Sequence, residues 1–250
     1  MFLKNIYRIV CFLYRNISTF LQIYIFPKSK KKIFNRNFVY FSYKEKNDLF
    51  RVNLDEFIYE KKNDFQSIFI FDENKIKFFI KKILNKNFRD FITNKTGFVY
   101  SIDYFSFYRN FHIPNNQMRS VYANFFHLDK PYSKNMLKII VPISVTSFRE
   151  GPLIIKKSKP LVLKNQEPNQ DDLFSFLSNK KENIIYAFHP SKCFHKASVP
   201  IKDKFCTQIM MQLNPSDKWK INSKIFDKQD KQEPKFPELI NIFDSYKPIA

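Results

Sequence analysis

The sequence of 250 residues contains only two glycines, Gly97 and Gly151. A P-loop and a dinucleotide-binding fingerprint each need several glycines, because the backbone must approach a phosphate closely. Nucleotide-binding enzymes of these two kinds are therefore excluded, and so are collagen-like chains. The 44% hydrophobic content also excludes a chain that is disordered throughout. The length fits one large domain or two small ones.

Cysteine is also scarce. The three cysteines, Cys11, Cys193 and Cys206, form no Cys-x-x-Cys pair, which argues against a disulfide framework and a thiolate zinc site. A reducing, cytoplasmic setting is expected. No uninterrupted apolar run approaches the 18 residues that a membrane-spanning helix needs. Residues 1–26 instead show an amphipathic helical pattern, which predicts either packing on the domain or peripheral contact with a membrane surface.

Acidic residues are the minority charge, with 23 Asp and Glu against 43 Lys and Arg and a formal net charge of +20. A basic surface is suited to nucleic acid or anionic lipid. A compositional bias explains the same numbers, because lysine (35) far exceeds arginine (8) and phenylalanine reaches 31. The charge is spread along the chain without a nucleic-acid-binding motif. We therefore favour bias, expect no nucleic-acid partner, and note that a positive field favours an anionic substrate.

Apolar periodicity changes near residue 96. Residues 74–92 repeat apolar side chains at helical spacing, which predicts one helix. The residues expected on its buried face are Ile76, Phe79, Ile80, Ile83 and Leu84. After Gly97, segments rich in Val, Ile, Tyr and Phe predict strands. These segments are 97–108, 119–127, 137–145, 184–189 and 205–213.

The remaining segments are polar. Residues 158–183 are expected to form an insertion with at most one short helix, and the residues from 217 a loosely attached tail. The sequence therefore predicts a single domain in three parts. These are a helical N-terminal part packing on the core (1–95), a β-rich core (96–216) and a polar C-terminal tail (217–250).

Two of the four histidines lie in a pattern that suits a metal. His127 and Asp129 are two residues apart at the end of an expected strand, so their side chains share a face. His195 is the candidate for a third ligand, which would complete the two-His, one-carboxylate triad that holds Fe(II) and leaves positions open. His112 and His189 are less suitable, since one lies in a Pro- and Asn-rich connection and the other directly precedes a proline. By itself, His-x-Asp is equally consistent with an ordinary hydrogen-bonded pair.

Four stretches around these residues resemble the phytanoyl-CoA dioxygenase family of Fe(II)- and 2-oxoglutarate-dependent oxygenases. They are Asn-Phe-Phe-His-Leu-Asp at 124–129, Leu-Lys-Ile-Ile-Val-Pro-Ile-Ser-Val at 137–145, Glu-Gly-Pro-Leu-Ile-Ile at 150–155, and the segment 185–198 that contains His195. The resemblance covers roughly residues 95–215. It implies a mainly β fold with flanking helices and a jelly-roll core, that is, a cupin-like double-stranded β-helix. It also implies Fe(II) held by His127, Asp129 and His195.

The chain departs from the family in two places. Lys156–Pro160 replaces a Gly-Ser-His turn, and no arginine follows Arg149, although the family places one about ten residues after the distal histidine to bind 2-oxoglutarate. Lys204 lies nearest to that position, and a lysine neutralises a carboxylate without the two-pronged bond of arginine. The resemblance further implies that Ser198 contacts the same carboxylate and that Asn124 faces the metal cavity.

The resemblance implies hydroxylation of a small-molecule or acyl substrate, with O2 and 2-oxoglutarate consumed and succinate and CO2 released. Two alternatives remain. The first is a catalytically inactive binding protein on the same fold, which the missing arginine would explain. The second is a basic protein associated with membrane surfaces or nucleic acid, whose binding would depend on salt and survive His127→Ala.

Overall fold

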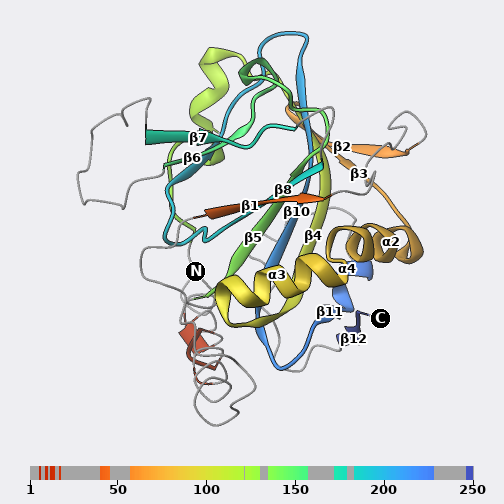
Figure 1. Ribbon diagram of the computed structural model, residues 1–250. Coiled ribbons are helices and arrows are strands. Elements are labelled where there is room, and N and C mark those ends of the chain that lie inside the picture. Colours follow the sequence, from red (N-terminus) through yellow and green to blue (C-terminus); the bar gives the residue numbers. More distant parts are fainter. Residues whose placement is uncertain are drawn as a thin grey trace.

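The computed structural model (Figure 1) describes residues 40–45, 57–120, 122–129, 135–156, 172–178, 183–227 and 246–249, with scattered positions between 6 and 17. These residues form two β-sheets, and helices α2 (Glu73–Ile83) and α3 (Lys86–Thr96) lie beside the larger one. Within the described ranges, no helix is both long enough and apolar enough to cross a membrane.

The larger sheet runs in the order β1-β8-β5-β10-β4-β11-β12, and the β2–β3 hairpin joins it through β3, which pairs with β4. Neighbouring strands in the described part are antiparallel, except that β11 runs parallel to β4. The strands are β1 (Tyr40–Glu45), β2 (Tyr59–Asn63), β3 (Gln66–Phe69), β4 (Val99–Phe111), β5 (Leu137–Pro142), β8 (Asn183–Phe188), β10 (Phe205–Ser216), β11 (Lys220–Asn222) and β12 (Tyr246–Pro248).

The smaller sheet has the order β7-β6-β9, formed by β6 (Leu153–Lys156), β7 (Leu173–Ser175) and β9 (His195–Ala197). The segment before β5 joins it through one antiparallel bridge between His127 and His195. From β4 to β10 the chain therefore alternates between the sheets, with only β6 and β7 consecutive in the smaller one. This alternation is that of a jelly roll, or double-stranded β-helix, and confirms the predicted fold class.

The two faces of the larger sheet pack against different partners, because successive side chains of a strand point to opposite sides. On β10, Ile209, Met211 and Leu213 belong to the main apolar core, which also contains the buried residues of α2 and α3. Met210, on the other face, packs on a second apolar cluster that includes Ile155 of the smaller sheet. Helices thus cover one face, and the smaller sheet covers the other. Even-numbered β10 residues face the interior of the jelly roll.

The predicted helix at 74–92 is two helices rather than one. Asp72 caps α2 by accepting a hydrogen bond from the Lys75 amide (2.7 Å), and Asn85 caps α3 by accepting one from the Phe88 amide (3.0 Å). Asparagine is a favoured N-cap, so a second helix begins where the apolar periodicity alone suggested continuation. The predicted apolar face is confirmed. The residues on that face, Ile76, Phe79, Ile80, Ile83 and Leu84, are all fully buried.

The predicted strand at 119–127 is wrong. The chain there forms the short 3-10 helices η2 (Asn115–Ser120) and η3 (Tyr122–Asn124), and only His127 pairs with a strand. The preceding Pro114-Asn115-Asn116 is rich in turn-forming residues, and the Gln117 amide donates to the Pro114 carbonyl (2.9 Å). This local turn chemistry prevails over the alternation of apolar residues.

Several described strands lie outside the five predicted strand segments. Strands β1, β2 and β3 fall within residues 1–95, and β7 falls within the polar insertion. The hairpin strand β2, Tyr-Glu-Lys-Lys-Asn, is largely exposed and carries charged side chains, so its sequence lacks the apolar alternation of a core strand. Within the insertion at 158–183, residues 158–171 and 179–182 lie outside the described residues.

The described residues near the C-terminus also differ from expectation. After residue 217, β11 and β12 extend the larger sheet, and Ile221 and Ile225 are buried, Ile225 within α4 (Lys224–Asp227). This part is therefore not loosely attached. Of residues 1–26, the described positions are helical, as predicted, and most of their apolar side chains are exposed, from Ile6 (43%) to Ile17 (59%). The rest of that segment lies outside the described residues.

Packing of α2 on the sheet gives a direct test of the core. Phe79 is fully buried and Phe78 next to it is 46% exposed. Phe79→Ala should lower the free energy of unfolding by about 3–5 kcal/mol, because it leaves a cavity in the core. Phe78→Ala is the matched control and should have a much smaller effect in urea denaturation. Equal losses from the two variants would contradict this orientation of α2.

Candidate metal centre

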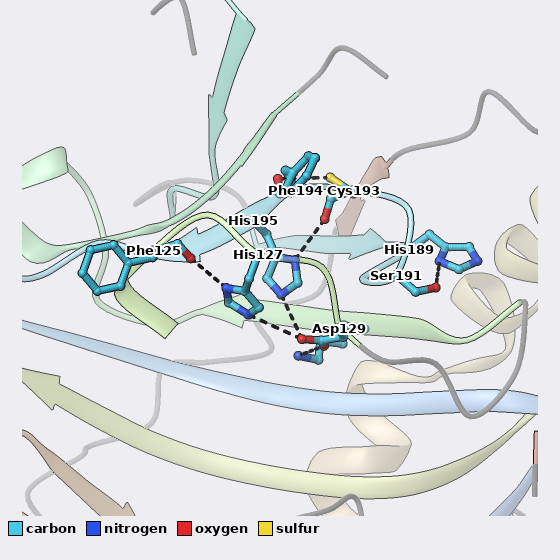
Figure 2. A network of polar contacts seen from close by, with 9 residues as sticks. Phe125, His127, Asp129, His189, Ser191, Cys193, Phe194 and His195 are labelled. Atoms are coloured by element: carbon cyan, nitrogen blue, oxygen red, sulfur yellow. Dashed lines mark hydrogen bonds and ion pairs between the residues drawn. The ribbon is translucent and has the colours of Figure 1, made fainter. Parts of the chain in front are cut away.

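The three predicted metal ligands come together at the edge of the smaller sheet (Figure 2). The His127 amide donates to the His195 carbonyl (3.0 Å), and the His195 amide donates to the His127 carbonyl (3.1 Å). The Asp129 amide donates to the Pro190 carbonyl (2.9 Å), which holds the second residue of the His-x-Asp pair. Backbone pairing therefore positions three side chains from two distant segments of the chain.

The donor atoms of these side chains face one another. Oδ1 of Asp129 lies 3.4 Å from Nε2 of His127 and 3.6 Å from Nε2 of His195. The two imidazole centroids are 4.3 Å apart, and all three donor atoms lie within 4.8 Å of one another. The side chains are 9%, 21% and 3% exposed for His127, Asp129 and His195, so the group is largely shielded from water.

Both imidazoles are oriented by backbone carbonyls. Nδ1 of His127 lies 2.7 Å from the Phe125 carbonyl oxygen, and Nδ1 of His195 lies 3.0 Å from that of Cys193 (Figure 2). A carbonyl only accepts, so each Nδ1 donates its proton, and in the neutral form of the ring this leaves the lone pair on Nε2. Nε2 of His195 is buried without a hydrogen-bond partner, since 3.6 Å to Asp129 is too long. Metal-binding histidines are commonly oriented in this way, with one ring nitrogen donating to a backbone carbonyl and the other directed at the metal.

The surroundings shift the pKa values of both Asp129 and His195 downward. Burial by itself would raise the pKa of Asp129, but the adjacent Lys138 ammonium opposes this effect, and that pKa lies well below its usual range. Burial lowers the pKa of His195, although the Asp129 carboxylate opposes this effect. The Asp129 carboxylate is therefore held in its anionic form, and burial favours the neutral form of His195.

Lys138 was missed by the sequence analysis. Its ammonium contacts Oδ2 of Asp129, whereas Oδ1 is the oxygen near the imidazole nitrogens, and its side chain is only 16% exposed. It is the one charged residue of β5, and it pairs across the sheet with Gln212 of β10 and Phe188 of β8. A single lysine within an apolar core strand is the signal that could have identified it, because lysine is rarely buried without a partner.

Two further predicted residues have buried polar atoms with no hydrogen-bond partner. These atoms are Nδ2 of Asn124 and Oγ of Ser198. Asn124 ends η3, which packs against β9, and Ser198 follows β9 directly. The chain after β9 passes so close to Gly151 that an added Cβ would lie 2.6 Å from the Ser198 carbonyl oxygen and the Pro200 nitrogen. Gly151 also has φ +72°, so this position requires glycine.

Lys204 does not lie with this group. It is exposed, and Glu150 is the acid on which its charge acts. Gln212, the neighbour of Lys138, lies eight positions further along the chain, roughly 26 Å away on an extended strand. This span exceeds the reach of two lysine-length side chains, so Lys204 does not contact Lys138, and its predicted role as an anchor of 2-oxoglutarate stays a prediction.

The other two histidines lie elsewhere, as expected. Nδ1 of His112 lies 2.8 Å from the Pro200 carbonyl oxygen, and Nδ1 of His189 lies 3.0 Å from the Ser191 hydroxyl. Figure 2 shows the His189 ring apart from the triad. Among the described residues, the three predicted ligands form the one group of His, Cys, Asp or Glu side chains arranged to hold a metal ion.

Comparisons with known proteins add little to this picture. No protein-family model matches the sequence, and no curated protein does. Two solved structures of HygX from Streptomyces hygroscopicus are similar to the chain. One has nickel, 2-oxoglutarate and hygromycin B bound (9% identity, TM-score 0.47), and the other has nickel and 2-oxoglutarate bound (10% identity, TM-score 0.46). Each alignment covers 78% of this chain and 87% of HygX. Similarity at this level does not establish a function.

The contact between Lys138 and Asp129 should stabilise the metal-free protein. Lys138→Met leaves a mostly buried carboxylate unpaired and should lower the free energy of unfolding by roughly 1–3 kcal/mol in urea with a chelator present. Combining it with Asp129→Asn should cost less than the two single losses added together.

Lys86→Met is the matched control, because the ion pair of Lys86 with Asp90 is well exposed and should contribute little. Strictly additive losses at positions 138 and 129 would contradict the pairing of these two side chains.

Proposed function

We propose that this protein is an Fe(II)- and 2-oxoglutarate-dependent oxygenase that hydroxylates a small molecule. The observation that carries the proposal is the convergence of two imidazole nitrogens and one carboxylate oxygen inside a jelly roll. A donor set of two histidines and one carboxylate is typical of non-haem Fe(II) sites with open coordination positions. With iron, 2-oxoglutarate and O2 bound, the site would supply oxidising power for hydroxylation and release succinate and CO2.

The chain's own residues would bind, orient and shield this group. The carbonyls of Phe125 and Cys193 fix the rings of His127 and His195 so that each Nε2 is available. The ring of Phe188 packs edge-on against that of His195 at 4.9 Å between centroids, which helps to exclude water on that side. Exclusion of water protects a reactive oxidant from side reactions.

The substrate class is supported by polar side chains on the inner face of the larger sheet. The Gln208 amide donates to the Tyr108 hydroxyl, and Nε2 of Gln212 is buried without a hydrogen-bond partner. Such groups suit a small polar molecule, and the net charge of +20 favours an anionic one. Assignment to the phytanoyl-CoA dioxygenase-like family stays a proposal, as does cytoplasmic localisation with peripheral membrane contact through residues 1–26.

A catalytically inactive binding protein on the same fold is the second candidate. It is favoured by the absence of any arginine after Arg149, because the family's usual anchor for 2-oxoglutarate is missing. The two candidates share the metal centre and differ in turnover. Release of succinate from 2-oxoglutarate by the iron-loaded protein would therefore separate them.

The proposal predicts a spectroscopic signature. Anaerobic addition of Fe(II) and then 2-oxoglutarate to the metal-free protein should produce a weak visible charge-transfer band, because the keto acid would chelate iron at the open positions. His195→Ala should lose the band by removing a ligand. His112→Ala is the matched control and should keep it, since His112 lies outside the triad.

Iron binding without the band would support the second candidate. Failure of the wild-type protein to retain iron would overturn the metal centre itself.

A further inference from the structure

The two oxygens of Asp129 have different partners. Oδ1 faces the imidazole nitrogens of His127 and His195 at 3.4 and 3.6 Å, and Oδ2 contacts the Lys138 ammonium. The Asp129 oxygen that Lys138 contacts is therefore a different one from the oxygen nearest the imidazole nitrogens. A metal held by those atoms would share the Asp129 carboxylate with a lysine that remains beside it.

This arrangement gives the centre one more positive charge than the triad alone. The Asp129 carboxylate and the Lys138 ammonium neutralise each other, and an imidazole that binds a metal through its Nε2 lone pair carries no charge. A divalent ion would then leave two uncompensated positive charges in a region shielded from water, where charges interact strongly. A dianionic ligand would restore neutrality, whereas a monoanion would leave one charge uncompensated.

A second group beside Lys138 suits an anion. Gln212 lies directly opposite Lys138 across β5 and β10, so the two side chains share the inner face of the sheet. Nε2 of Gln212 is buried and has no hydrogen-bond partner, and an amide nitrogen can only donate. An ammonium and an unpaired N–H donor thus lie next to each other, with no arginine in the chain after Arg149 to perform this task.

We propose that Lys138 makes the binding of the metal and of a dianionic 2-oxo acid cooperative and selects a dianion over a monoanion. This inference rests on the proposed function, because it concerns the same centre. Lys138 weakens the affinity for the metal alone by repulsion and strengthens the affinity for metal and dianion together. By linkage, the dianion must raise metal affinity by the factor by which the metal raises dianion affinity.

Calorimetric titration of the metal-free protein with Mn(II), in place of Fe(II), tests this without turnover. In the wild type, 2-oxoglutarate should raise Mn(II) affinity by about tenfold or more, within the usual range of coupling, and pyruvate should raise it much less. In Lys138→Met, Mn(II) alone should bind several-fold more tightly, and the difference between the two oxo acids should shrink to about twofold.

Three further variants complete the experiment. Lys138→Arg keeps the charge and should keep the wild-type coupling. Lys86→Met removes an exposed lysine and should change neither affinity. Lys204→Met tests the anchor that the sequence predicts, and a loss of coupling in this variant with none in Lys138→Met would overturn the role of Lys138.

The failures of the two proposals are distinguishable. If the wild type binds Mn(II) and Lys138→Met shows the same affinities and the same preference for 2-oxoglutarate, this inference is wrong while the metal centre stands. If the wild type and the variants all fail to bind Mn(II), the proposed function is wrong, and the inference fails with it.

Discussion

Two backbone hydrogen bonds between His127 and His195 determine where the candidate metal centre forms. The residues are 68 positions apart, and the bonds of 3.0 and 3.1 Å make them direct antiparallel neighbours. Side chains of such neighbours lie on the same face, which brings the imidazole centroids to 4.3 Å. Asp129 then needs only one more backbone bond, to Pro190, to direct its carboxylate at both rings.

The jelly roll allows these three side chains to converge because the two faces of its larger sheet pack against different partners. Helices α2 and α3 cover the outer face of the larger sheet with apolar side chains. Inner-face positions of the same strands are thereby free to carry polar groups such as Lys138 and Gln212. The protein can hold a charged carboxylate in this interior because Lys138 lies against it, and the cost of burying a charge is offset by a nearby opposite charge.

Other lysines of the described part have exposed side chains. The chain contains 35 lysines, and pairs such as Lys86 with Asp90 lie at the exposed surface, where water and salt screen them. Lys138 is the same residue type in a different environment, with 16% of its side chain exposed. Composition therefore says little about which lysine matters, since burial determines how strongly one charge acts on another.

The sequence by itself determined the features that depend on local patterns. Apolar periodicity identified the buried face of α2 and the core strands β4, β5, β8 and β10, and both glycines, Gly97 and Gly151, lie at positive φ. The spacing of His127 and Asp129, with the resemblance around His195, selected the three residues that the structure brings together.

Only the tertiary structure decided the rest. The capping of a second helix by Asn85 and the 3-10 turns after Pro114 are set by side-chain and turn hydrogen bonds that periodicity does not record. Lys138 became the partner of Asp129 because pairing of β5 with β8 and β10 places it on the inner face. Such contacts join segments far apart in the chain, and their geometry is fixed by strand pairing rather than by any local pattern of residues.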